Sequence, residues 1–261
     1  MINSRPRSDA PTLAELPDPQ EVLDRTDWAS LETPTGTGEL LPAALARVLH
    51  TDPDVSATAV VDALRQVTHQ NTVYEATVPV ALFVASILNH PVTAAGDGRH
   101  DTAPASRHVT RAVLLNWLGS TAYDADDTCV AIGERASDGV FLDECPDTRA
   151  FRDLRPVFYS AVHPLLGDDD ANVREAALVA ALPLSEHPLV MPHRDELADH
   201  ARRVLTTCTD RGRRGRVLDA LAAWGHDISA LENADDVAAR ELHARRIAER
   251  WVGGYSEDPP F

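Results

Sequence analysis

The fold is decided by residues 168–182, which read DDDANVREAALVAAL. The aspartates at the start of this segment offer side-chain oxygens to the free amides of a helix N-terminus, and the apolar residues after them recur at helical intervals. A valine is followed by an apolar residue four positions on and by a leucine nine positions on. These offsets occur three times, at Val55, Ala59 and Leu64, at Val109, Val113 and Leu118, and at Val173, Ala177 and Leu182.

A further apolar helix is predicted before two of the copies, at residues 41–49 and at about 150–166. The repeating unit is therefore helix, short turn, helix. One such pair, burying three or four large side chains, gains roughly 5–10 kcal/mol, whereas ordering its residues, about 35 of them, costs roughly 1–2 kcal/mol for each. Neighbouring pairs must share a continuous core, as the units of helical repeat proteins do.

The repeat pattern also sets the predicted domain organisation. Residues 1–18 and 253–261 lack periodicity and are expected to be flexible tails, and residues 19–252 are expected to form one α-solenoid. Residues 90–105 are rich in Gly, Pro, Asp and Thr and are predicted to be an exposed loop. The valine pattern fails after about residue 210, so the last helices are expected to cap the repeat.

Composition restricts the partners. The formal net charge of the 261 residues is −17, so the average surface repels phosphate backbones and anionic membranes and suits a basic partner. All 24 basic residues are arginines, which we attribute to genome bias. We see no membrane-spanning stretch and no secretion signal. The three cysteines are an odd number without paired spacing, so reduced thiols and a cytoplasmic location are expected.

The opening segment resembles the second helix of a HEAT repeat. In that family, an aspartate in the turn and an arginine six positions on form a side-chain ladder between units, and Asp168 and Arg174 match this pattern. His50 and Ser56 occupy these places in the first copy, which puts the ladder in doubt there. The resemblance implies an all-α, HEAT/armadillo-like α-solenoid, which is a right-handed superhelix of antiparallel helix pairs.

Other segments resemble the bacterial, actinobacterial-type HEAT repeat proteins that carry a His-Gln-Gly-Thr-x-Tyr-x-Ala-Thr segment. The matching residues are 28–31, 36–38, 69–77 and 113–118, with Asn71 in place of the glycine, and the resemblance covers about residues 25–210. Some members of such families are thought to act as immunity proteins for polymorphic toxins. The resemblance implies a non-enzymatic binding protein, with a basic toxin domain as a candidate partner.

The segment 69–75 stands out from what a repeat needs. Thr72 and Glu75 fit a capping box, but a short turn between helices does not need the other polar and aromatic groups. Core packing is expected for the tryptophans, but Trp28 precedes the first clear helix and is a candidate aromatic anchor at an open end. The predicted partner-binding residues are Trp28, His69, Gln70, Asn71, Tyr74 and Glu75; the alternative is that this segment is structural, with Tyr74 buried.

A second hypothesis rests on the one basic cluster of the chain. It would make the protein a HEAT-like nucleic-acid binder or a DNA glycosylase-type enzyme, although the net charge disfavours nucleic acid. The alternative is structural, because the helix dipole favours arginines at a helix C-terminus. The cluster comprises Arg202, Arg203, Arg211, Arg213, Arg214 and Arg216.

Sequence motifs for catalysis are absent. The chain has no glycine-rich phosphate loop, no Gly-x-Ser-x-Gly turn and no His-Glu-x-x-His. His193, Glu196 and His200 have helical spacing, but two histidines and an acid on an exposed helix are usually a solvated face, and Pro188 and Pro192 break the segment that begins at His187. We therefore predict no enzyme activity, no cofactor and no metal. A third hypothesis is a scaffold subunit of a larger assembly.

Overall fold

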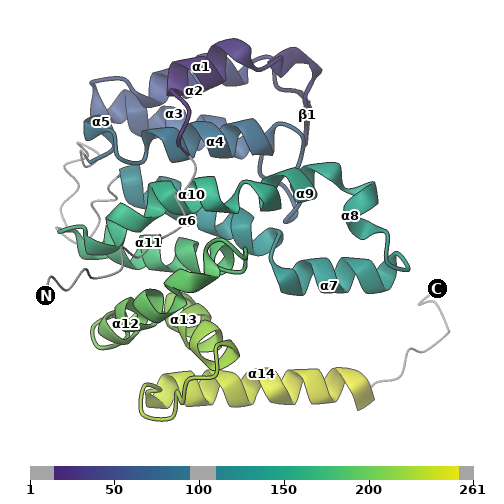
Figure 1. Ribbon diagram of the computed structural model, residues 1–261, viewed down its shortest axis with the longest axis vertical. Helices are drawn as coiled ribbons and strands as arrows, with labels where there is room; N and C mark the ends of the chain where they lie inside the picture. The colour runs from purple at the N-terminus through teal and green to yellow at the C-terminus, as the bar shows by residue number, and fades with distance from the viewer. Residues whose placement is uncertain (1–14, 95–109, 253–261) are drawn as a thin grey trace, which may run out of the picture. The chain divides into compact units, whose positions relative to one another are not determined.

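The computed structural model describes residues 15–94 and 110–252, with side chains described up to residue 246. The predicted all-α class is confirmed (Figure 1). The strands in the described ranges are β1 (Glu32–Thr33) and β2 (Gly36–Thr37), a short antiparallel pair. None of the described helices is long and apolar enough to cross a membrane.

The chain divides into two compact units. The first unit ends at Leu197, and the second begins at Ala198. This division precedes the point at which the repeat pattern ends, near residue 210. The elements up to the division are α1 (Pro19–Arg25), η1 (Trp28–Ser30), α2 (Leu41–Val48), α3 (Pro53–Arg65), α4 (Thr77–Ile87), α5 (Pro91–Ala94), α6 (Thr110–Asp124), α7 (Asp127–Ala136), α8 (Phe141–Glu144), α9 (Pro146–Asp153), α10 (Arg155–Val162), η2 (His163–Gly167), α11 (Ala171–Leu184) and η3 (Met191–His193), and α12 (Arg194–Leu205) crosses it.

The predicted boundaries can be compared with these elements. Helix α1 begins at Pro19, where the predicted tail ends, and Asp18 accepts hydrogen bonds from the amides of its first turn. Helix α5 lies inside the predicted loop 90–105. The predictions for residues 1–14, 95–105 and 253–261 fall outside the described residues.

The three copies of the repeated pattern lie on α3, α6 and α11. Helix α6 packs against both α3 and α11, and α4 packs against α1 and α10. Gly119 lets α6 approach α11 closely, because a Cβ atom at this position would lie 3.0 Å from the Cα of Ala180. The leucine of each copy is buried, whereas Val55 and Val113 are partly exposed and Val109 lies outside the described residues. The repeat therefore identifies helices that pack next to one another.

Aspartates cap two of the repeated helices, α3 and α11, as predicted. The Asp52 carboxylate accepts the amide of Asp54 at 3.0 Å at the start of α3. Asp170 accepts the amides of Asn172 and Val173 at 2.7 and 3.2 Å at the start of α11. Each carboxylate satisfies donors that the first turn of a helix leaves free.

The turn before α11 differs from the predicted side-chain ladder. Arg174 does not pair with the carboxylate of Asp168; it donates to the carbonyl oxygens of Asp168 and Asp169, at 2.6 and 2.8 Å. The Asp168 carboxylate instead forms an ion pair with Arg111 of α6 at 2.9 Å and accepts the amide of Asp170. Asp168 therefore connects its own turn to the preceding repeated helix.

The turn before α3 fills the same positions with different residues. The Nδ1 atom of His50 accepts a hydrogen bond from the amide of Asp52 at 3.0 Å. The Asp168 carboxylate accepts the corresponding hydrogen bond from the amide of Asp170. The Ser56 hydroxyl donates to the carbonyl of Val48 at 2.6 Å, so Ser56, like Arg174, binds the carbonyl end of the preceding segment. Two different side-chain sets thus hold similar turns.

A buried arginine connects the ends of several helices in the first unit. Arg155, at the start of α10, is 2% exposed. Its Nη2 atom donates to the carbonyl of Ala125 at 2.7 Å and lies 3.3 Å from Glu186, which follows the C-terminus of α11. Its Nη1 atom lies 3.6 Å from Asp127, the first residue of α7. Since arginine stays charged, these partners are required for its burial.

The two carboxylates beside Arg155 have pKa values shifted in opposite directions. Burial raises the pKa of Glu186 to about 7, and the negative charge of Asp127 acts in the same direction. The hydrogen bond from the Asp127 amide and the charge of Arg155 oppose this shift. Burial also opposes ionisation of Asp127, but the hydrogen bond and charge of Arg152 and the charge of Arg155 together lower its pKa. Asp127 is therefore the group that stays ionised.

The second unit contains a buried ion pair of its own. It holds the last part of α12 together with α13 (Arg211–Ala223) and α14 (Ala234–Val252). Arg214 and Asp236 are 2.6 Å apart, with side chains 4% and 6% exposed. Arg214 also donates to the carbonyl groups of Leu205, Cys208 and Leu231. This arginine is thus required for packing within the unit.

We predict that Arg155→Met lowers the free energy of unfolding by about 3–5 kcal/mol, because it removes the cationic partner of Glu186 and one of the donors to the Ala125 carbonyl. The matched control is Arg149→Met, since Arg149 pairs with Asp143 at an exposed site. The control should lose less than about 1 kcal/mol. Urea unfolding of both variants tests this; equal losses would show that the buried arginine does not organise the unit.

We predict that the ionisation of Glu186 makes the fold less stable as the pH rises. Its folded pKa of about 7 lies above the ordinary value of 4.5, so the folded state binds more protons than the unfolded state between these two pH values. The contribution of protonated Glu186 to the free energy of unfolding is fully present below about pH 4.5, and it is lost as the pH rises through about 7. Glu186→Gln should remove the loss and gain about 1–3 kcal/mol over the native chain at pH 8. The exposed control Glu39→Gln should keep the native slope in urea unfolding from pH 4.5 to 8.

Candidate functional site

The predicted binding segment forms a tight, exposed hairpin turn before α4. His69 and Thr72 form an isolated antiparallel bridge, and the amide of Thr72 donates to the carbonyl of His69 at 3.1 Å. The two residues between them have positive φ angles, 49° at Gln70 and 57° at Asn71. Two successive left-handed residues are typical of a type I′ turn, which favours Asn and Gly. Gln70 is therefore in an unfavourable backbone conformation.

The side chains of this turn face solvent together. His69, Gln70 and Asn71 are exposed, and Tyr74 is half-buried. The Tyr74 hydroxyl lies 3.5 Å from Nδ1 of His69. The turn thus presents an imidazole, two amides and a phenol on one short segment.

The predicted capping box is wrong. The Thr72 hydroxyl donates to the carbonyl of Gln70, and the Glu75 carboxylate accepts the amide of Glu32 at 2.8 Å. Helix α4 begins at Thr77, whose hydroxyl accepts the amide of Tyr74 at 3.0 Å. Glu75 therefore attaches strand β1 to the start of α4, a contact between residues 43 positions apart that local spacing does not reveal.

Trp28 does not lie at an open end. Its side chain is 4% exposed, and its indole N–H donates to the carbonyl of Leu23 at 3.0 Å. Trp28 therefore lacks the exposed ring surface that an aromatic anchor needs. It belongs to the core.

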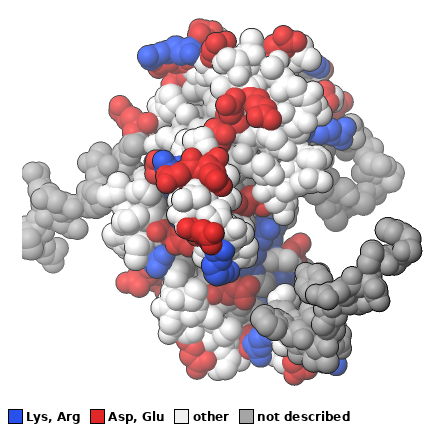
Figure 2. Space-filling model, turned by 90° about the vertical axis from the view of Figure 1, so that its right-hand side faces the viewer, with Lys and Arg blue, Asp and Glu red and all other residues white. Residues whose placement is uncertain are grey.

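Three carboxylates from different elements lie near one another beside the turn. Glu32 is on β1, Glu75 ends the turn and Asp147 is in the first turn of α9. Burial, followed by the charges of Glu75 and Glu32, raises the pKa of Asp147. We call Glu32, Glu75 and Asp147 the acidic patch. Figure 2 views the side on which Figure 1 shows β1 and α8, and acidic side chains form several clusters there.

The arginine cluster does not form one exposed patch. Arg214 is buried by its pairing with Asp236, and Arg202 pairs with Asp199 at 2.9 Å. Arg203, Arg211 and Arg216 are exposed. Arg214 is therefore used in the packing of the second unit and is not available to bind phosphate.

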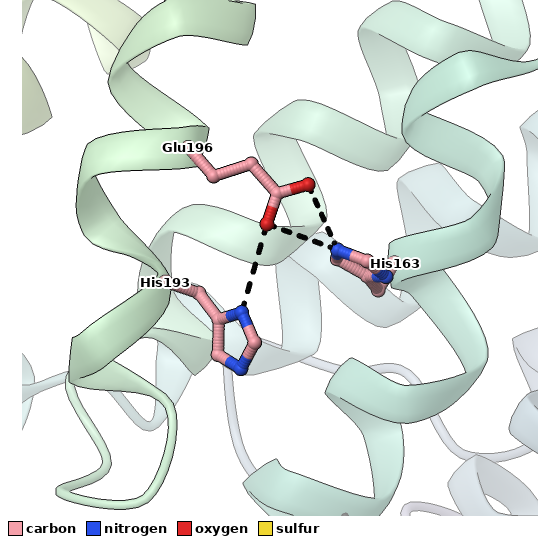
Figure 3. A group of neighbouring side chains, drawn as sticks. All are labelled: His163, His193 and Glu196. Carbon is pink, nitrogen blue, oxygen red and sulfur yellow. Dashed lines mark hydrogen bonds and ion pairs between the residues drawn. The ribbon is translucent and has the colours of Figure 1, made fainter. Parts of the chain in front are cut away.

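Two residues of the predicted histidine segment lie beside a third residue that the spacing did not indicate. His193 and Glu196 lie close together at their i,i+3 spacing, but the third group is His163 of η2, which contacts both carboxylate oxygens of Glu196 (Figure 3). His187 accepts the amide of Leu189 in a local turn. No periodic signal connects His163 to the segment, because the contact spans 33 positions.

The thiols of Cys129 and Cys145 are not activated. Burial and the charge of Asp126 raise the pKa of Cys129 to about 11, and burial with the charges of Glu144 and Asp147 raises the pKa of Cys145. A thiol that stays protonated at neutral pH is a poor nucleophile. These positions give no support to a cysteine-dependent reaction.

Comparisons with known proteins identify no relative. No protein-family model matches the chain, and neither a curated protein nor a solved structure matches it. The assignment of function therefore rests on the residues themselves.

We predict that Gln70→Gly raises the free energy of unfolding by about 0.5–1 kcal/mol, since glycine adopts the left-handed conformation without the clash that Gln70 carries. The control Gln66→Gly has a negative φ of −69° in the native chain and should lose about 0.5–1 kcal/mol. Urea unfolding measures both. A loss at Gln70 would mean that its side chain supports the fold.

Proposed function

We propose that this chain is a non-enzymatic, HEAT-like α-solenoid that binds a basic protein through the turn 69–75 and the acidic patch. The solenoid arrangement is supported by the packing of α6 against α3 and α11, the helices that carry the repeated pattern. The observation that carries the function is the juxtaposition of an exposed polar turn with three carboxylates, joined through Glu75.

The backbone of the turn supports a functional role. A residue held at positive φ without glycine costs free energy, and such residues concentrate at functional sites. Gln70 is exposed, and its side chain is not needed for the main-chain hydrogen bond that closes the turn. The unfavourable conformation presents its amide outward, beside that of Asn71. These groups suit hydrogen bonds to a partner's backbone or side chains.

The charge of the protein supports a basic partner. A net charge of −17 attracts cations at long range, and the acidic patch would orient the encounter. The neighbouring charges of Glu75 and Glu32 raise the pKa of Asp147, and a cation that approaches this carboxylate relieves that repulsion. This favours arginine- or lysine-rich protein surfaces over nucleic acid.

An immunity or antitoxin role is the specific form of the proposal. It rests on the resemblance to bacterial HEAT repeat proteins, and it makes the partner a basic toxin domain. Genes that flank the coding sequence discriminate here: a neighbouring secreted toxin supports the role, and a neighbouring repair or RNA-processing cluster counts against it.

We predict that neutralising the acidic patch slows partner binding. The patch variant is Glu32→Gln, Glu75→Gln and Asp147→Asn together; glutamine at 75 retains an acceptor for the Glu32 amide. At low salt the association rate with the captured partner should fall roughly tenfold, with a melting temperature close to that of the native chain. Affinity capture from the native host, followed by binding kinetics at two salt concentrations, measures this.

The control variant removes the same number of charges elsewhere. Asp62→Asn, Asp169→Asn and Asp195→Asn change exposed residues outside the patch. This variant should keep most of the native association rate. If patch and control variants slow binding equally, only the overall charge matters and the patch is not the site.

A further inference from the structure

We propose that His163, His193 and Glu196 form a binding site for a divalent transition-metal ion of the zinc class. The three residues come from η2, η3 and the first turn of α12, all within the first unit. Each offers one ligand atom, and these atoms lie within 4.8 Å of one another. Figure 3 shows both imidazoles directed toward the carboxylate of Glu196.

The distances fit a tetrahedral ion. Nε2 of His163 lies 3.1 and 3.2 Å from the two oxygens of Glu196, and Nδ1 of His193 lies 3.6 Å from one of them. Ligands about 2.0–2.1 Å from a tetrahedral zinc ion are about 3.3 Å apart. The side chains therefore need only small movements to bind an ion that replaces the hydrogen bonds between them.

A buried tyrosine fixes the orientation of both imidazoles. The ring of Tyr159 on α10 is fully buried and packs against His163 and His193, with centroid distances of 5.4 and 5.0 Å. The two imidazole centroids are 5.7 Å apart. Ligands held by packing lose less conformational freedom on binding than side chains that rotate freely at a surface. This three-ring cluster distinguishes the site from a chance meeting of surface residues.

The donor set selects the class of ion. Two imidazole nitrogens with one carboxylate oxygen suit zinc and its transition-metal neighbours, whereas calcium and magnesium prefer sites made of oxygen. The His163, His193 and Glu196 side chains are 36%, 23% and 47% exposed. An ion bound by these three groups therefore keeps a position open to water, as in zinc sites with three protein ligands.

The alternative is a hydrogen-bonded cluster that binds no ion. The hydrogen bonds and charges of His163 and His193 lower the pKa of Glu196 against the effect of burial, so the carboxylate is ionised and holds the imidazoles in either case. A metal site binds zinc with an affinity that substitution of His163 or His193 lowers, whereas a hydrogen-bonded cluster does not bind it. A zinc titration separates them.

The test is competition for Zn²⁺ between a chromophoric chelator and the metal-free full chain, purified without a histidine tag. His163→Gln and His193→Gln should each weaken zinc binding by about tenfold or more. The control His200→Gln removes the histidine that sequence spacing pairs with Glu196, and it should retain native affinity. An excess of Ca²⁺ or Mg²⁺ should not displace the zinc.

Circular dichroism of the metal-free variants checks that each remains folded. If His163→Gln does not fold, Glu196→Gln tests the same site, because glutamine can still accept a hydrogen bond from an imidazole. Co²⁺ in place of Zn²⁺ should give the intense visible absorption of a four-coordinate ion, lost in His163→Gln. Equal zinc affinity in the native chain and His163→Gln would overturn the assignment, as would a loss confined to His200→Gln or failure of the native chain to compete.

Discussion

The first unit depends on the burial of one permanent charge. Arg155 cannot shed its proton, so the helix ends around it must supply acceptors, and they do so through the Ala125 carbonyl and two carboxylates. The same helix, α10, carries Tyr159 one turn later and ends just before His163. The position of the three-ring cluster thus follows from how the first residue of α10 is held.

Features encoded within a few residues could be predicted from the sequence, whereas those that depend on distant contacts could not. Asp52 and Asp170 act as the helix caps that their turns indicated, because a cap needs only its own first turn. The capping box at Thr72 failed because Glu75 accepts the amide of Glu32 from β1. For the same reason, spacing located the turn 69–75 but did not reveal the acidic patch, the burial of Trp28 or the contact between His163 and Glu196.

The absence of lysine has a structural counterpart. Genome bias alone would leave the arginines without a particular role, whereas Arg155 and Arg214 each bind several acceptors in the core. Arg214 donates to three carbonyl groups and pairs with Asp236, and a planar group with five donors can serve that many acceptors where a lysine cannot. An arginine in a basic run is therefore not by itself a sign of an anionic ligand.

Helix α7 has no buried residue. Its first turn is fixed by the Asp126 cap and by the amide of Asp127 on Glu186, and Gly133 accommodates the ring of Phe141 from α8. A helix that buries so little apolar surface can open while the rest of the unit stays folded, at a fraction of the global unfolding free energy. Its amide protons should exchange with solvent sooner than those of α6 or α11, and α7 should be cut by proteases more readily than these two helices.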